Sequence, residues 1–335
     1  MNWELGYSTS YHACLVDPVT WADGQQFDMI SGSVNRTAEG LRGSAEMKCT
    51  DYPYASDRWV RIWMDVKQSG ASEHVPLFTG LVSMPEQTIE GTLSEVKLQC
   101  FSVLKPAQDV YLPIGWYAAK GFKVSEVIAN LLKVCPAPAL IEEDSPRLAQ
   151  NVIAEKNETN LSMVESLLEI AGWRMTIDGG GTIHVGPEAT DVTKQFGALH
   201  GDMLEPKVSR KNDLFDCPNV FRVVSDNESV VAYDDDPDSP FSTAARGREI
   251  WKEESSVKLA DNESLLQYAR RKLKEAQGVG ETISYSRSYD PDVNVTDIIS
   301  LSYPRQNLIG NYIVRSQKIS LDHKATTSEE VRTIE

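Results

Sequence analysis

The stretch Trp59-Val60-Arg61-Ile62-Trp63-Met64-Asp65-Val66 decides the fold class of the first third of the chain. From Val60 onward every second residue is aliphatic or methionine, and the alternate positions hold Trp59, Arg61, Trp63 and Asp65. This period of two places the two sets on opposite faces of an extended strand. The same alternation recurs in Gly43–Cys49 and in Leu93–Phe101. We therefore predict that residues 1–105 form a barrel or a sandwich of antiparallel strands.

Trp59 and Trp63 lie on the polar face of this predicted strand. Large aromatic side chains on the outward face of a strand often belong to a protein interface. The alternative is that a neighbouring loop or helix of the same chain covers them. The pattern favours neither interpretation, so an external binding surface and an internal contact both stay open.

The residues from 106 to 188 change to helical periodicity. In Gly121–Cys135 the apolar residues recur at intervals of three and four, which predicts an amphipathic helix. Pro136 ends it, because proline cannot continue the backbone hydrogen-bond ladder.

A second helix is predicted over Leu161–Ala171, with Thr159 or Asn160 as its N-cap and Gly172 as its C-cap. The alternating residues that follow, 173–185, contain a glycine-rich turn and predict a β-hairpin. Two helices and a hairpin make a small α+β domain.

The last part, 189–335, is again mostly β. One helix is predicted over Asn262–Gln277, with Asp261 as its N-cap and Gly278 as its C-cap. The predicted strands are Val220–Val224, Ser229–Ala232, Ile283–Tyr289, Ile298–Leu301 and Tyr312–Leu321.

The chain is strongly acidic. Its 335 residues include 33 lysines and arginines and 49 aspartates and glutamates, a formal net charge of −16. A surface that binds nucleic acid or anionic lipid needs clustered basic residues, so the negative net charge argues against binding either of them. The sequence has no signal-peptide pattern, so we expect the chain to fold in a reducing cytoplasm. No run approaches the ~20 apolar residues of a membrane span, so we expect no membrane segment.

Several short segments resemble catalytic or ligand-binding motifs, but their residues or spacings do not match those motifs. Asp178-Gly179-Gly180-Gly181 joins two strands and lacks the lysine of a phosphate loop. The acidic run 234–238 lacks the glycine and the glutamate of a calcium-binding EF-hand. The histidines form no metalloprotease motif. The cysteines are widely spaced, and Cys49 and Cys100 fit small buried apolar residues better than zinc ligands. We expect no catalytic residues, no metal site and no cofactor.

Several short sequence motifs occur in order along the chain. They are Ile30–Val34, Leu77–Val82, the cap, helix and hairpin of Thr159–Ile183, Asn219–Val223, Val295–Leu301 and Leu308–Val314. In their order and spacing they resemble the baseplate hub proteins of phage tails, a family of prophage-type hubs and late-control-D-like proteins. The chain is more distantly similar to the N-terminal part of type VI secretion spike proteins.

This resemblance implies a mainly β fold with two tail-tube-like antiparallel β-barrel domains and a helix–helix–hairpin insert. The first barrel would cover 1–105, the insert domain 106–188, and the second barrel with one helix 189–335. Three chains would then present six barrels, so that a homotrimer joins a six-fold tail tube to a three-fold central spike. The resemblance implies no enzymatic activity.

The partners implied are the tail tube or tube-initiator protein, the central spike protein, the tape-measure protein and other baseplate components. The protein would assemble in the bacterial cytoplasm and lie in the tail baseplate of a virion or of a related contractile injection system. A trimer would carry 3 × −16 = −48 charges, so we expect an electronegative channel through which DNA passes only as cargo. Alternative functions are a tail-associated cell-wall hydrolase and a glycan- or receptor-binding tail module.

Overall fold

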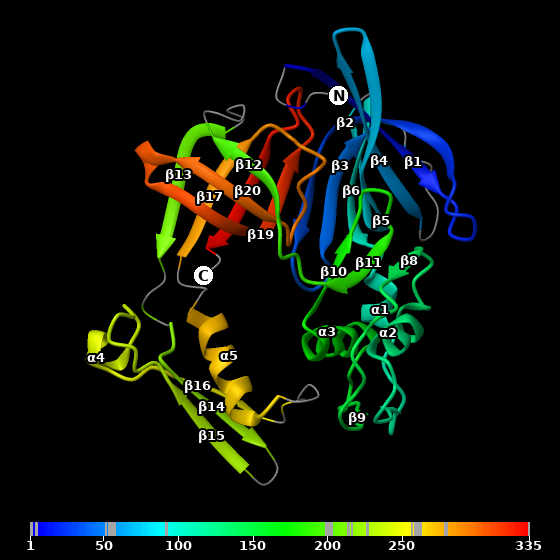
Figure 1. The fold of residues 1–335 in the computed structure, drawn as a ribbon. Coiled ribbons are helices and arrows are strands. Elements are labelled where there is room, and N and C mark those ends of the chain that lie inside the picture. Colours follow the sequence, from blue (N-terminus) through cyan, green and yellow to red (C-terminus); the bar gives the residue numbers. More distant parts are fainter. Residues whose placement is uncertain are drawn as a thin grey trace.

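Figure 1 shows a mainly β chain in the computed structural model. The structure describes all residues except 1, 2, 4, 5, 51, 53–57, 91, 92, 198–203, 213, 214, 216, 226, 227, 256, 258–262, 278–280, 334 and 335. The mainly β class and the extended antiparallel pairing predicted from the alternating stretches are confirmed.

The first β half contains six strands: β1 Ser8–Val16, β2 Asp23–Thr37, β3 Gly43–Cys49, β4 Trp59–Gln68, β5 Ala71–Glu90 and β6 Leu93–Ser102. They pair in the order β1-β4-β5-β6-β3-β2, and β1 also pairs with β2, so the pairings return to their starting strand. The aliphatic and methionine face of β4 is fully buried, as its alternation predicts. The barrel expected from the resemblance stays a prediction.

The second β half also has six strands: β12 Val192–Gly197, β13 Leu204–Asn212, β17 Glu281–Arg287, β18 Ile298–Tyr303, β19 Leu308–Ser320 and β20 Thr327–Thr333, with the short helix η1 Pro304–Gln306. Their order is β12-β18-β19-β20-β17-β13, and only the β12–β18 pair is parallel. Strand β19 pairs with β2 of the first half, from Ser316 opposite Thr37 to Ser320 opposite Ser33. The two halves therefore share one 12-stranded sheet and one hydrophobic core.

The insert follows the first half and builds its own core. Its elements are α1 Lys105–Asp109, β7 Tyr117–Ala118, α2 Val124–Leu132, β8 Ala139–Ile141, β9 Val152–Ile153, α3 Asn160–Ala171, β10 Trp173–Ile177 and β11 Ile183–Pro187. Both predicted helices and the hairpin are confirmed. Thr159 is the N-cap of α3, since its hydroxyl accepts from the Ser162 amide, and Gly172 ends the helix at φ 61°.

A second α+β unit interrupts the second half. It consists of β14 Val220–Ser225, β15 Glu228–Tyr233, α4 Thr243–Arg246, β16 Trp251–Ser255 and α5 Leu265–Gln277. The predicted helix corresponds to α5, whereas its predicted caps Asp261 and Gly278 lie outside the described residues. The strands β15-β14-β16 form a sheet of their own, which α5 covers with a separate small core.

That separate sheet was not predicted, because alternation identifies a strand but not its partners. The domain boundaries drawn from the sequence stay predictions. Figure 1 shows the insert below the strands of the first half and the second α+β unit below those of the second half. Each β half thus carries an α+β unit on the same side of the large sheet. In the described part of the chain no helix is long and apolar enough to cross a membrane.

Candidate functional site

The glycine-rich turn of the insert docks on the outer face of β4 and β5. A Cβ atom on Gly179 would lie 1.8 Å from the Pro76 carbonyl oxygen. One on Gly181, where φ is +85°, would lie 2.8 Å from the Thr79 Cβ. Glycine is needed here because the backbone of the turn closely approaches the β5 strand. This close approach explains why the sequence is rich in glycine at a turn that is not a phosphate loop.

Polar contacts fasten this turn. The Thr79 hydroxyl donates to the Gly179 carbonyl at 2.9 Å. The Trp21 indole and the Arg61 guanidinium donate to the Gly180 carbonyl at 2.9 and 3.0 Å. Arg61 is buried and also bonds the Thr79 hydroxyl at 2.9 Å and the Asp23 carboxylate at 2.5 Å. Arg61, on the polar face of β4, therefore anchors the insert to the first half from within the chain.

Trp59 and Trp63 answer the question left open by their pattern. Trp59 is buried in the insert core, where its ring lies 5.6 Å from that of Trp21. Trp63 is half-buried, and its indole donates to Asp23 at 2.9 Å. The interpretation as a contact within the chain is confirmed for Trp59. Its side chain is not available as an external binding surface.

Two arginines tie the insert to the β halves. Buried Arg42, beside the β2–β3 turn, donates to both carboxylate oxygens of Glu165 on α3, at 2.8 and 2.9 Å. Burial raises the pKa of Glu165, although the Arg42 charge opposes the shift. Arg174 of β10 donates to the Thr296 carbonyl at 2.9 Å and lies 3.2 Å from Asp297. The insert is thus fixed against both halves.

The two α+β units meet at a polar joint. The Tyr268 hydroxyl of α5 lies 2.7 Å from Glu254 and 3.2 Å from Glu169 of α3, and Lys272 pairs with Glu169. Burial is the largest cause that raises the pKa of Tyr268, and both carboxylates add to it. The joint holds the two units together through charges rather than through a shared apolar core.

A fully buried ion pair lies inside the second half. Arg287 donates to both oxygens of Glu329, at 2.9 and 2.6 Å, and both side chains are completely inaccessible. The Tyr285 hydroxyl and the Gln317 amide also donate to Glu329, each at 2.7 Å. Because no substrate can reach these groups, the cluster acts in folding: it fixes the register of β17 against β20.

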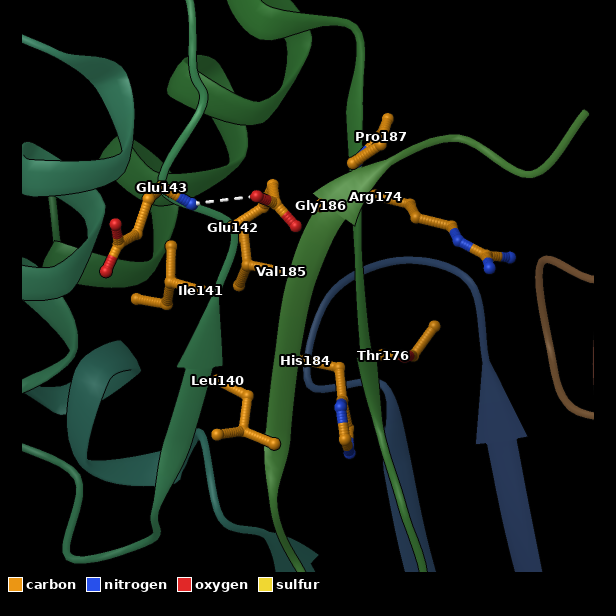
Figure 2. Close-up of a pocket in the computed structure, with 10 residues that line it drawn as sticks. All are labelled: Leu140, Ile141, Glu142, Glu143, Arg174, Thr176, His184, Val185, Gly186 and Pro187. Atoms are coloured by element: carbon orange, nitrogen blue, oxygen red, sulfur yellow. Dashed lines mark hydrogen bonds between the residues drawn. The ribbon is translucent and has the colours of Figure 1, made fainter.

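A shallow pocket opens on the sheet β10-β11-β8 and is drawn in Figure 2. Leu140 and His184 project from adjacent strands, whereas the Arg174 side chain extends away toward the second half. The Glu142 carboxylate accepts from the Glu143 amide at 3.2 Å. His184 bonds Asp178 at 3.0 Å. These polar groups therefore take part in contacts within the chain rather than converging on a common point.

Other titratable clusters are equally engaged. Asp65 lies between two imidazoles, 2.9 Å from His12 and 2.5 Å from His74, on the outer face of β1, β4 and β5. In the acidic run 234–238, Asp234 accepts from the Ser239 hydroxyl at 2.6 Å. Among the described residues no group of three or more histidine, cysteine, aspartate or glutamate side chains is arranged to hold a metal ion.

The five cysteines are buried and form no disulfide bond. Burial raises the pKa of the Cys49 and Cys135 thiols to about 11, so they are protonated at neutral pH. The buried positions predicted for Cys49 and Cys100 are confirmed. His323 lies exposed on the surface, and His200 lies outside the described residues.

Comparison with known proteins rests on structure. No protein-family model matches the chain, and no curated protein matches its sequence. The 43 kDa tail protein of prophage MuSo2 from Shewanella oneidensis is 12% identical, with a TM-score of 0.66 over 98% of this chain and 97% of that one. The tail protein from Neisseria meningitidis MC58 is 14% identical, with a TM-score of 0.70 over 99% and 97%.

A third solved structure is more distant. The Escherichia coli c3393 protein, a component of the type VI secretion system, is 7% identical, with a TM-score of 0.54 over 92% of this chain and 74% of that one. The chain therefore has the fold of phage tail proteins. The resemblance to phage tail proteins and, more distantly, to a type VI secretion component is confirmed at the level of the fold, whereas the two barrel domains that it implies stay a prediction.

Proposed function

We propose that this chain is the structural baseplate hub of a phage tail or of a tail-like particle. The observation that carries the proposal is the full-length match to two solved tail proteins, one of them from a prophage, which leaves almost no residue outside the shared fold. At 12 and 14% identity the likeness concerns the fold, so the role comes from those proteins by analogy.

The internal organisation supports a symmetry adaptor. Each half contributes six strands to the large sheet, and each carries an α+β unit on the same side. A homotrimer would then present six similar β halves to a six-fold tail tube and three identical chains to a central spike. The tape-measure protein and other baseplate components would be further partners, within the tail baseplate of a virion.

The net charge suits a channel. Three chains would bring −48 charges, and an electronegative lumen repels the phosphate backbone, so DNA passes without adhering. The fixed contacts of Arg42, Arg61 and Arg174 within the chain support this proposal, because these cations are already paired.

Light scattering on the purified chain tests the trimer, and we expect three times the mass of one chain. Electron microscopy of particles should then place three copies between tube and spike. A monomer that is absent from particles would refute the hub. A cell-wall zymogram tests the alternative hydrolase, and sugar binding that fails after Trp63→Ala would favour the glycan-binding alternative.

A further inference from the structure

The insert carries an exposed aromatic groove that none of the contacts above uses. It lies between the loop 110–118 and helix α2 and has a volume of about 410 Å³. Tyr111, Tyr117 and Phe122 on its walls are 64, 61 and 53% exposed, and Trp116 is half-buried beside them. Exposed aromatic side chains gathered in one groove are typical of an interaction site.

The groove is preformed, because backbone hydrogen bonds hold its loop to the rest of the insert. The Leu112 amide donates to the Glu158 carbonyl at 2.8 Å, and the Ala154 amide to the Trp116 carbonyl at 3.0 Å. The Asn160 amide, at the start of α3, donates to the Val110 carbonyl at 3.0 Å. Ordering this surface would therefore cost little free energy when a ligand binds.

The polar groups of the groove are uncharged and rich in donors. No charged residue lines it, although the chain carries a net charge of −16. The Trp116 indole and the hydroxyls of Tyr111 and Tyr117 line the groove, and each carries a hydrogen-bond donor. The Asn130 amide oxygen already accepts from Lys133 at 2.7 Å, which leaves its N–H groups to donate. The groove thus offers aromatic faces and hydrogen-bond donors to a neutral ligand.

We propose that this groove binds an uncharged, proline-rich segment of a partner protein in the polyproline II conformation. Such a segment has no internal hydrogen bonds, so its carbonyl oxygens can accept from the indole, hydroxyl and amide donors. Its proline rings pack on aromatic faces and lack the N–H groups that would need acceptors. The neutral lining matches a neutral ligand in charge.

Two other ligand shapes fit the groove less well. An amphipathic helix satisfies its own carbonyls and would leave the donors unpaired. An added β-strand needs a strand edge, and β7 at this surface spans only Tyr117–Ala118. The helical ligand is an outcome that the experiment below distinguishes.

The test uses the full chain and a fluorescein-labelled, acetylated and amidated decaproline peptide, followed by fluorescence anisotropy. A glycine–serine peptide of equal length is the neutral, flexible comparison, and an uncharged amphipathic helical peptide is the third probe. We expect saturable decaproline binding at least tenfold tighter than that of either comparison peptide.

Two conservative variants examine the donors without emptying the groove, and a third serves as the control. Trp116→Phe and Tyr117→Phe keep a ring but remove a donor, and each should weaken decaproline binding about two- to tenfold, the range for one neutral hydrogen bond. Tyr233→Phe removes an exposed hydroxyl from the other α+β unit and should change nothing. Unaltered circular dichroism shows that each variant is folded.

The proposal is overturned if decaproline does not saturate, if either comparison peptide binds as tightly, or if both donor variants bind like the parent chain. The measurement involves neither trimer nor particle. Its failure would leave the hub proposal standing, and failure of the hub would leave the groove.

Discussion

Replacing Gly179 by alanine should release the insert from the first β half. The new Cβ would lie 1.8 Å from the Pro76 carbonyl oxygen and 2.4 Å from its carbon, both backbone atoms. Real Cβ atoms stay at least 3.0 Å from such neighbours, so the turn must retreat by 3.0 − 1.8 = 1.2 Å. That movement stretches the three hydrogen bonds that Thr79, Trp21 and Arg61 donate to the turn.

The cost follows from those bonds. Two neutral donors contribute about 0.5–1.5 kcal/mol each, and the charged guanidinium contributes about 1.5–3 kcal/mol, so the loss is about 2.5–6 kcal/mol. The control is Gly180→Ala in the same turn, where the nearest neighbour of a Cβ is the Asp178 carboxylate at 3.3 Å. This control should stay within about 1 kcal/mol of the parent chain.

Urea unfolding measures the free energies, and hydrogen–deuterium exchange measures the docking itself. For Gly179→Ala we expect faster exchange in 173–187 and in β4, with the core strands β3 and β6 unchanged. The reasoning is refuted if the two alanine variants unfold within 1 kcal/mol of each other, because the steric contact would then carry no weight.

Three further outcomes are expected. Glu329→Leu should lose about 3–5 kcal/mol because it leaves the Arg287 charge buried and unpaired, whereas Arg287→Met with Glu329→Leu should recover most of it in a double-mutant cycle. Burial raises the pKa of Tyr7 and Tyr11 to about 12, so their contribution to stability is complete below pH 10, the unfolded pKa, and is lost as pH rises toward 12. An absorbance titration of the phenols should show Tyr7 and Tyr11 among those that ionise late, and Tyr7→Phe with Tyr11→Phe should remove two late-ionising groups. Iodoacetamide should label the buried cysteines only after unfolding, and rapid labelling of the folded chain would contradict their burial.

These tyrosines also show how the halves are joined. The Tyr11 hydroxyl donates to the Asp322 carbonyl at 2.6 Å, and that of Tyr7 to the Tyr289 carbonyl at 3.2 Å. Arg36 of β2 reaches Asn294 at 2.8 Å. Polar side chains of the first half thus cross to loops of the second, beside the β2–β19 pairing. Alkaline pH should weaken this seam before it affects the core.

Local order could be predicted from the sequence. The alternation of Gly43–Cys49 predicted β3 with the bounds that the structure has. The spacing of Leu161–Ala171 predicted α3 with Gly172 as its C-cap, and Thr159 was one of the two N-caps that it allowed. Such features depend on neighbours within a few residues, because period and capping are properties of the backbone nearby. The mainly β class and the insert followed from them.

Tertiary contacts decided everything that joins distant segments. The pattern left open whether Trp59 faces a partner or a segment of its own chain, and the insert more than 40 residues later covers it. Arg287 and Glu329 become a buried pair only because β17 lies beside β20. The short sequence motifs along the chain indicated the fold of tail proteins because they resemble the motifs of that family. Strand partners, the docked glycine turn and the donor-rich groove could not be read from periodicity, which reports the face of an element and not what lies against it.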